Sequence, residues 1–280
     1  MTELSVISYN VRVDTTQDRA YGWAARREAV TALLRERGAA LIGLQEALAH
    51  QRDDLVHGLE GYEAVGVGRD DGATTGEFNP ILYQTGRLRL CRQETFWLSE
   101  TPDVPGSMSW GAGYPRIVTW SEFEAAGGGR RLFLFNTHLD HQSVRAREEG
   151  ARLLRARMAA IAGSRPAVVT GDFNCESGSR PLQILVAPGA DGLALQDAQN
   201  VAGEGHAGPA GTLTSNFREP LGPKIDFILV TAGVEVLRHA VLDEKAGDRF
   251  PSDHLPVLAE IRLRDQEGAG SQGANSSWLL

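Results

Sequence analysis

Acidic and amide side chains follow two apolar runs of the sequence. Glu46 comes directly after one run, and Asp172 and Asn174 come directly after another. Polar groups just beyond strand ends can face a shared cleft while the strands themselves stay rigid. A carboxylate in such a cleft can accept the proton of an attacking water, or it can hold a hard divalent cation such as Mg²⁺. These residues therefore predict metal-assisted attack of water on a substrate.

Histidines and an aspartate lie close together near position 138. His138 and Asp140 alternate along an expected strand end, so both can point toward the cleft while Leu139 packs inward. A protonated His138 could stabilise phosphate charge, whereas His141 has the opposite parity and is expected to be structural. A zinc site is an alternative, although the spacing matches no familiar pattern of zinc ligands.

Asp226 lies in an apolar, strand-like run, where a buried acid is costly unless it is paired. His254 is the natural partner, because a carboxylate bonded to one ring nitrogen fixes the tautomer while the other nitrogen faces the substrate. Asp253 is then free for a metal or for the attacking water. Asn10, which follows the first apolar run, can hold a ligating carboxylate or a metal-bound water through its amide.

Length and composition limit the classes of protein that this chain can form. Its 280 residues are 42% apolar, which is enough for the core of one large domain. The net charge of -8 argues against a broad nucleic-acid-binding surface, because clustered Lys and Arg hold phosphate backbones. The two cysteines exclude a disulfide framework, and no leader-like segment or apolar run of about 18 residues occurs. We therefore expect a cytoplasmic protein without a membrane span.

Apolar segments alternate with helical patterns, which predicts a layered α/β (α+β) architecture. A helix is expected over Trp23–Arg37, ended by Gly38, and Ser143 is expected to open another. A glycine turn at 127–129 joins two strands as a hairpin, so the sheets cannot be purely parallel. The expected strands are Leu4–Tyr9, Leu41–Gln45, Pro80–Tyr83, Ile117–Phe123, Leu132–Thr137, Ala167–Thr170, Ile225–Val230, Val234–Leu242 and Leu255–Ile261.

Basic side chains on the helix after Ser143 are expected to form a solvated face rather than a phosphate-binding patch. These side chains are Arg145, Arg147, Arg152, Arg155 and Arg157. The tail Gln266–Ser277 is rich in Gly and Ser and is expected to be disordered.

Six motifs occur in the order in which they stand in one superfamily of hydrolases. They are Ser8-Tyr9-Asn10, Leu44-Gln45-Glu46, Asn136-Thr137-His138, Gly171-Asp172-Phe173-Asn174, Ile225-Asp226-Phe227 and Ser252-Asp253-His254. Each motif alone is weak, but all six in sequence are highly specific. On these residues the chain resembles the endonuclease/exonuclease/phosphatase (DNase-I-like) superfamily from about Leu4 to Leu263. The segments Phe96–Pro102 and Trp110–Arg116 resemble an uncharacterised bacterial subgroup of it.

The resemblance implies a fold and a division of roles. The fold would be a four-layer sandwich of two packed, mixed β-sheets flanked by helices, with a domain over 1–263 and a tail over 264–280. The roles it implies are Mg²⁺ or Mn²⁺ on Glu46 with help from Asn10 and Asp253, a general base at Asp172, phosphate binding by Asn174 and His138, and transition-state stabilisation by Asp226 with His254. The division of work between Asp172 and His254 stays open.

Departures from better known members narrow the substrate. Asn174 is followed by Cys175 rather than by the Tyr-Arg of the inositol phosphatases, and the acidic charge disfavours a DNA repair enzyme. We therefore expect a phosphodiesterase, or less favourably a phosphomonoesterase, acting on a small metabolite, glycan or nucleotide. No obligate protein partner is evident. Glu77, Arg116 and Trp110 are candidates for substrate or metal support, although Trp110 is favoured to pack within its loop.

Two other functions stay open. One is a single-strand nuclease or deadenylase, which rapid degradation of labelled RNA or DNA would favour. The other is a catalytically silent module that binds metal or phosphate. The presence of all six motifs counts against the silent module, because loss of activity in this fold usually removes a metal-binding or catalytic group.

Overall fold

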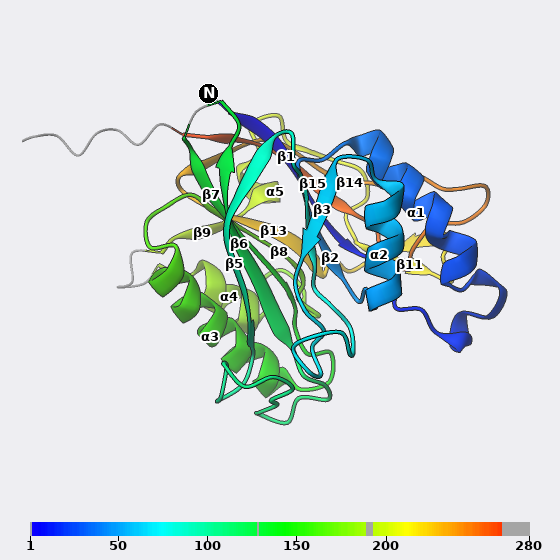
Figure 1. Cartoon of the computed structure of the whole chain (residues 1–280), viewed down its shortest axis with the longest axis horizontal. Coiled ribbons are helices and arrows are strands. Elements are labelled where there is room, and N and C mark those ends of the chain that lie inside the picture. Colours follow the sequence, from blue (N-terminus) through cyan, green and yellow to red (C-terminus); the bar gives the residue numbers. More distant parts are fainter. Residues whose placement is uncertain (1, 128, 189–192, 265–280) are drawn as a thin grey trace, which may run out of the picture.

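Two β-sheets packed face to face form the centre of the molecule (Figure 1). The computed structural model describes residues 2–127, 129–188 and 193–264. Within these residues one sheet has seven strands, in the spatial order β10 (His206–Ala207), β14 (Val234–Val241), β15 (Val257–Leu263), β1 (Glu3–Asn10), β2 (Leu41–Gln45), β4 (Ile81–Gln84) and β3 (Tyr62–Val65). The other has six, in the order β5 (Leu88–Trp97), β6 (Ile117–Ala125), β7 (Arg131–His138), β8 (Ala167–Asp172), β13 (Asp226–Thr231) and β9 (Leu195–Asp197).

Both sheets are mixed, with parallel and antiparallel neighbours. β1 pairs parallel with β2 and antiparallel with β15, while β7 pairs parallel with β8 and antiparallel with β6. A separate hairpin is formed by β11 (Leu213–Ser215) and β12 (Glu219–Leu221). The expected hairpin between β6 and β7 is thus confirmed, although Gly128 of its turn lies outside the described residues.

Helices cover the outer faces of the two sheets and complete four layers (Figure 1). α1 (Trp23–Arg37) and α2 (Ala49–Gly58) lie on the seven-stranded sheet, and α3 (Val144–Ile161) and α4 (Arg180–Val186) lie on the six-stranded sheet. Short segments η1 (Thr16–Tyr21) and α5 (Ala198–Val201) occur in the connections. The sequence marks both long helices: Gly38 ends α1 at φ 55°, and the Ser143 hydroxyl accepts from the Ala146 N–H at 3.1 Å to cap α3.

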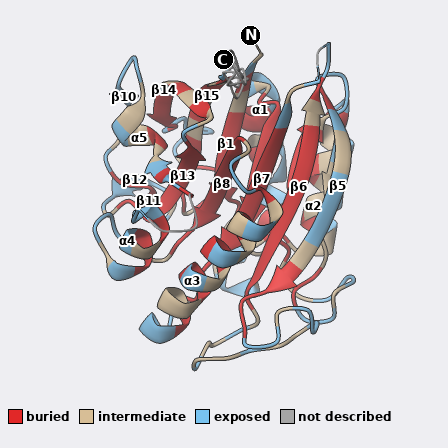
Figure 2. Cartoon of the chain, turned by 90° about the vertical axis from the view of Figure 1, so that its left-hand side faces the viewer, coloured by how far each residue is buried: buried red, intermediate tan, exposed pale blue. Residues whose placement is uncertain are grey.

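Apolar side chains fill the three interfaces between these layers, and central strands such as β1, β7 and β8 are correspondingly almost entirely buried (Figure 2). Between the sheets, Val6 and Ile81 pack against Phe123 and Leu134. Beneath α3 and α4 the interface includes the aromatic side chain of Trp120. Alternating strand residues thus face either the sheet partner or a helix, which is the pattern of a sandwich covered on both sides.

The four-layer architecture expected from the sequence is confirmed, and nearly every expected strand is found with its ends moved by one or two residues. The basic face of α3 is an exception in one respect. Arg155 is buried, and its guanidinium donates to the carbonyl oxygens of Leu185 and Leu193 at 2.6 and 2.7 Å. This arginine therefore holds the chain after α4 against α3 instead of facing solvent.

The side-chain amide of Asn136 makes hydrogen bonds from one sheet to the other. Asn136 on β7 donates to the carbonyl oxygens of Leu44 and Pro80 at 2.7 and 3.0 Å. Its own oxygen accepts from the Gln45 amide at 2.7 Å and from the Thr170 hydroxyl at 3.0 Å. The buried Asn136 amide thus donates two hydrogen bonds and accepts two, which uses its full hydrogen-bonding capacity. It can therefore fix the position of one sheet on the other.

Gly43 on β2 is required for that close approach of the sheets. A Cβ atom at this position would lie 2.2 Å from the Thr170 hydroxyl oxygen and 2.7 Å from the Asn136 oxygen. Any side chain here would therefore push the two sheets apart.

Two expectations concern other parts of the chain. The glycine- and serine-rich tail Gln266–Ser277 lies outside the described residues. Within the described residues, no helix has the length and apolar character needed to cross a membrane.

Candidate active site

Strand register brings three of the sequence-predicted residues into one row. His138 on β7 lies opposite Asp172 on the parallel strand β8, and Asp172 lies opposite Asp226 on the antiparallel strand β13. In the other sheet, Asn10 at the end of β1 lies beside Gln45 at the end of β2, directly before Glu46. Both sheets therefore deliver their polar strand ends to one edge of the sandwich.

Asp172 is the centre of this polar cluster. Its Oδ1 accepts from the backbone N–H of Asn174 at 2.9 Å, and its Oδ2 accepts from the Asn10 amide at 3.0 Å. The Nε2 atoms of His138 and His254 lie 3.4 and 3.8 Å from the same Oδ2. Asp172 therefore has an oxygen directed at both imidazoles, as a proton acceptor in a catalytic site requires.

Glu46 is held rigidly at the start of the next connection. Its backbone adopts the left-handed conformation at φ 63°, which turns the side chain back toward β1. Oε1 accepts from the Asn10 amide and Oε2 from the Val13 N–H, both at 2.9 Å. The carboxylate keeps lone pairs free, because each oxygen accepts only one of these bonds.

Asn10 links the two carboxylates. Its amide nitrogen donates to both Glu46 and Asp172, while its oxygen accepts from the Arg12 N–H at 3.0 Å. Because a backbone N–H can only donate, this contact fixes which end of the amide faces the carboxylates. Of the two roles expected for Asn10, the geometry favours holding a ligating carboxylate over giving its own oxygen to a metal.

His254 and Asp226 form the buried pair that the sequence suggests. His254 Nδ1 lies 2.9 Å from Asp226 Oδ2, and Nε2 is left facing Asp172. Asp226 Oδ1 is buried without a hydrogen-bond partner. The pair thus presents one ring nitrogen, in a fixed orientation, to the centre of the site.

The ionisation of these groups follows from their burial and from one another. Burial and the charge of Asp226 raise the pKa of Asp172 to about 7, against the opposing charge of His254. Burial and the nearby Arg116 keep the pKa of His138 well below its ordinary value. Burial also opposes the charged form of His254, but the carboxylates of Asp226 and Asp172 raise its pKa well above the ordinary value. His138 is thus the neutral imidazole and His254 the charged one.

Carboxylate groups here fit a hard divalent cation. Ligand atoms of Glu46, His138 and Asp172 lie within 4.8 Å of one another. Burial opposes the charged form of Glu46, yet His254 and the N–H donors keep the pKa of Glu46 below its ordinary value, so the carboxylate stays charged. An anionic oxygen with free lone pairs, next to a second carboxylate, is the donor set that Mg²⁺ or Mn²⁺ takes. Asp253 is not one of these three residues, and its Oδ2 lies 3.5 Å from an Arg12 guanidinium nitrogen.

Arg69 and Arg116 form a basic part of the wall of the same site. Arg116 is 4% exposed, lies 3.5 Å from Asp140 Oδ2 and donates to His141 Nδ1 at 2.8 Å. Arg69 donates to Glu77 Oε2 at 2.6 Å, and its guanidinium lies over the Tyr114 ring at 4.8 Å from the centroid. Two cationic side chains are therefore fixed beside the carboxylate cluster.

The carboxylate cluster and the two arginines line a single cavity of about 410 Å³. The residues that line it are Arg12, Val13, Gln17, Glu46, Arg69, Glu77, Tyr114, Arg116, His138, His141, Asp172, Asn174 and His254. The volume is of the size of a small-molecule site rather than of a nucleic-acid channel.

Three expectations about this region need correction. Asp140 does not line the cavity: its carboxylate accepts from the backbone N–H groups of Gly113, Gln142 and Ser143 and so anchors the loops behind Arg116. His141, expected to be structural, lines the cavity. Trp110 is absent from the lining residues, and its carbonyl oxygen accepts from the Ser143 hydroxyl at 2.8 Å.

Several residues at the cavity were not found by sequence reasoning. Arg12, Arg69 and Tyr114 lie on loops, where no strand or helix period predicts the direction of a side chain. Arg12 could have been found from its position, because it follows the Ser8-Tyr9-Asn10 motif by two residues. Tyr114 could have been found in the same way, because it stands two residues before the expected Arg116.

The sequence as a whole matches a known family. Residues 7–254 match the model of the Endonuclease/Exonuclease/phosphatase family, and the chain belongs to this family. An uncharacterized protein of Acanthamoeba polyphaga mimivirus is 24% identical over 163 residues. That match spans 56% of this chain and 60% of the viral protein.

Solved structures give the same assignment. A family protein from Bacteroides vulgatus superposes with a TM-score of 0.88 at 35% identity, covering 94% of this chain and 100% of the other. A mannosyl-6-phosphatase from Bacteroides thetaiotaomicron gives a TM-score of 0.86 at 33% identity, covering 93% and 100%. The human Nocturnin catalytic domain shares the fold at 17% identity, with a TM-score of 0.71 and 93% of each chain covered.

Proposed function

We propose that this protein is a divalent-metal-dependent hydrolase of a phosphate monoester on a small polar molecule, with a sugar phosphate as the leading candidate. One observation supports this most strongly: Asp172, held by Asn10 and Asn174, lies within 4 Å of two imidazoles that line the same cavity, one neutral and one charged. A second support is the similar Bacteroides thetaiotaomicron protein, which is described as a mannosyl-6-phosphatase. A monoester is thus preferred over the diester that the sequence first suggested.

In this proposal the phosphate lies between the carboxylate cluster and the two arginines of the cavity. His138 and Asn174 bind its oxygens, and Asp172 accepts the proton of a water that attacks in line with the leaving oxygen. Without a bound cation the pKa of Asp172 is about 7, so this carboxylate is more basic than an ordinary aspartate and is suited to accept a proton. Charged His254, held by Asp226, stabilises the negative charge on the phosphoryl oxygens in the transition state.

Glu46 and Asp172 are the residues that would hold the divalent cation, with Asn10 keeping the two carboxylates in place and Asp253 close by. When bound, the cation would supply Lewis-acid stabilisation of the phosphate charge. Of these residues, Glu46 carries the charge that is fixed by backbone and amide donors, so it is the principal ligand in this proposal.

A panel of phosphoesters assayed with Mg²⁺ and with Mn²⁺ tests the proposal. The panel contains mannose 6-phosphate, 4-nitrophenyl phosphate, bis(4-nitrophenyl) phosphate and a labelled single-stranded oligonucleotide. We expect metal-dependent release of phosphate from the two monoesters and slower reaction of the diester. Faster cleavage of the oligonucleotide would favour the nuclease, and binding of Mg²⁺ without turnover of any substrate would favour the silent module.

A further inference from the structure

We infer that Arg69 and Arg116 form a receptor for the second negative charge of a phosphomonoester, and so determine whether the site takes monoesters or diesters. This inference rests on the proposed function and adds a residue-level basis for its substrate class. Near neutral pH a phosphomonoester carries close to two charges, because its second pKa is about 6, whereas a diester carries one. A site that selects the monoester needs fixed cations for the additional charge.

Arg116 has the burial and the spare hydrogen-bonding capacity that this role requires. It lines the cavity, yet its Nη1 is buried without a hydrogen-bond partner. A buried guanidinium nitrogen left unpaired is costly, so a ligand oxygen that reaches it would be bound strongly. The other nitrogens are already placed by Asp140 and His141, so the group is fixed before a ligand arrives.

The charge of Asp140 does not cancel that of Arg116. Three backbone N–H groups donate to the Asp140 carboxylate, and its contact with Arg116 Nε is long, at 3.5 Å. Much of the negative charge is therefore taken up by peptide dipoles. Arg116 keeps a positive field that faces the same cavity as His138 and Asp172, and this field is one cause of the lowered pKa of His138.

Arg69 supplies the second cation from a different loop. Its carbonyl oxygen accepts from the Trp97 indole N–H at 2.6 Å, which fixes the backbone, and Glu77 fixes the guanidinium. Its Nε is buried and makes no hydrogen bond. Arg69 and Arg116 are close enough for their charges to repel, and this repulsion adds to burial in lowering the pKa of Arg116. Two like charges held together in this way are stabilised by a dianion.

In this inference the carboxylates and the arginines of the cavity have different roles. Glu46 and Asp172 lie on the side proposed for the cation and for water activation, while Arg69 and Arg116 lie on the side proposed for the non-bridging oxygens. A diester has an alkyl group in place of one charged oxygen. It would leave Arg116 Nη1 or Arg69 Nε without a ligand oxygen, so the site would bind its transition state less tightly.

Two substrates with the same leaving group test the inference. We compare kcat/KM for 4-nitrophenyl phosphate and for methyl 4-nitrophenyl phosphate, with the wild type, Arg69→Gln, Arg116→Gln and a control, Arg131→Gln. Arg131 is a matched control because it also pairs with a buried glutamate, Glu122, but lies far from the cavity along β7. One charge-assisted hydrogen bond is worth roughly 10- to 100-fold.

In Arg69→Gln and in Arg116→Gln, kcat/KM should fall by roughly 10- to 100-fold for the monoester and by less than about 5-fold for the diester. Inorganic phosphate should also become a weaker product inhibitor by a similar factor. Equal losses on both substrates, or no loss on either, would overturn the inference. If the wild type hydrolyses neither substrate, the proposed function itself fails. If the wild type is active but the variants keep its ratio of kcat/KM for the monoester to that for the diester, only the inference about Arg69 and Arg116 fails.

Removal of an arginine could leave a buried acid unpaired and unfold the protein. Two further variants avoid this problem: Arg116→Lys keeps the charge but loses the planar fork, and Arg69→Gln combined with Glu77→Gln leaves no unpaired acid at that wall. The double variant should still show the selective loss on the monoester, and Arg116→Lys, which keeps the charge, should show a smaller selective loss; thermal unfolding should be unchanged in both. A normal monoester to diester ratio in both folded variants would contradict the assignment.

Discussion

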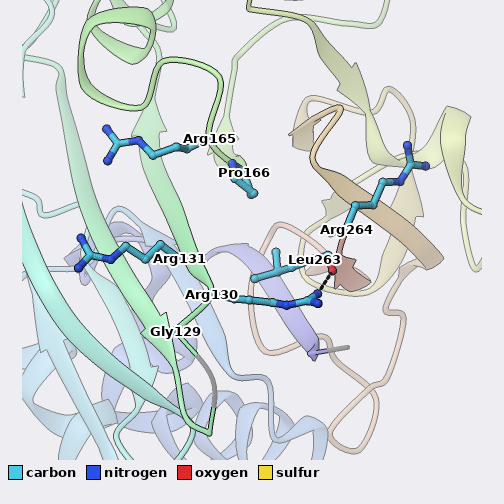
Figure 3. A pocket seen from close by; sticks show the side chains of 7 residues that line it. All are labelled: Gly129, Arg130, Arg131, Arg165, Pro166, Leu263 and Arg264. Atoms are coloured by element: carbon cyan, nitrogen blue, oxygen red, sulfur yellow. Dashed lines mark hydrogen bonds between the residues drawn. The ribbon is translucent and has the colours of Figure 1, made fainter. Parts of the chain in front are cut away.

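Two of the arginine-rich hollows in the described part of the chain are of similar size but differ in how their side chains are arranged. The active-site cavity measures about 410 Å³, and a hollow formed by the opposite ends of β7 and β8 measures about 360 Å³. The residues that line the second are Gly129, Arg130, Arg131, Arg165, Pro166, Leu263 and Arg264 (Figure 3). Charge and volume alone would not separate the two.

The difference lies in where the guanidinium groups point and in what holds them. In the second hollow the side chains of Arg131 and Arg165 extend away from Arg130 and Arg264 (Figure 3). Arg131 and Arg165 are 50% and 42% exposed and pair with Glu122, and Arg130 donates to the Leu263 carbonyl oxygen. In the cavity of the candidate active site, by contrast, Arg69 and Arg116 are buried and line the same space as a cluster of carboxylates. Fixed, convergent and partly unsatisfied polar groups therefore define a site better than basic charge does.

The strongest challenge to this comparison is the replacement Asp172→Asn. It removes the proton acceptor and one ligand charge while keeping the side chain's shape, so we expect kcat/KM for 4-nitrophenyl phosphate to fall by at least about 10²-fold. Arg131→Gln, in the second hollow, should change kcat/KM by less than about 2-fold. A strong loss in Arg131→Gln, or near-normal turnover in Asp172→Asn, would remove the distinction between the two hollows.

The buried pair behind Asp172 gives the next largest effect. His254→Gln and Asp226→Asn should each lower kcat by about 10²-fold, because the charged imidazole is lost or left without its partner. If the two residues act as one unit, the double variant should lose little more than either single variant. Steady-state kinetics on all three variants provide the measurement, and fully additive losses would show that the two residues act separately.

A smaller effect should follow from the charge on Glu46. Glu46→Gln keeps most of the shape but removes one anionic ligand, so the Mg²⁺ concentration for half-maximal rate should rise by about 10-fold. Calorimetric titration with Mn²⁺ should show the same loss without any turnover. An unchanged metal dependence would place the cation elsewhere in the cavity.

The smallest expected effect concerns a buried polar pair outside both hollows. His239 Nδ1 lies 2.9 Å from His206 Nδ1, and burial lowers the pKa of His239 to about 3. As the pH falls, His239 is protonated in the unfolded chain near its ordinary pKa of about 6.5, well before it is protonated in the folded protein. The contribution of His239 to the free energy of unfolding is therefore complete above about pH 6.5 and is lost as the pH falls toward 3. The wild type should lose about 2 kcal/mol between pH 7 and pH 5 from this group alone.

His239→Asn isolates that contribution, because Asn keeps a polar atom near the position of Nδ1 but does not titrate. Urea unfolding at pH 7 and pH 5 should show a smaller acid loss in the variant than in the wild type. Parallel pH profiles for the two proteins would show that His239 is protonated without cost in the folded state.

The fold and the chemical centre could be predicted because they depend on strands. Periodic apolar runs marked the strands, and the polar residues at their ends fell into one row because the register of β7, β8 and β13 aligns His138, Asp172 and Asp226. The short helix α2 and strand β3 were missed, since neither has a strong apolar period. The match to family motifs added the roles that spacing alone left open.

The basic wall could not be predicted in the same way. β7 ends at His138, so the alternation used to place Asp140 and His141 does not extend to them, and the chain turns into α3 instead. Arg69 and Tyr114 come from loops whose shape depends on contacts distant in sequence, such as the Trp97 indole with the Arg69 carbonyl. Similarly, no sequence pattern tells which end of the Asn10 amide faces the carboxylates.

Asn136 has a consequence that extends beyond its own hydrogen bonds. Asn10 and Glu46 belong to one sheet, whereas His138, Asp172 and Asp226 belong to the other, so the reacting groups straddle a seam. Asn136 is fastened across that seam just beneath them. We therefore expect Asn136, which does not line the cavity, to set the alignment between the two halves of the proposed catalytic site.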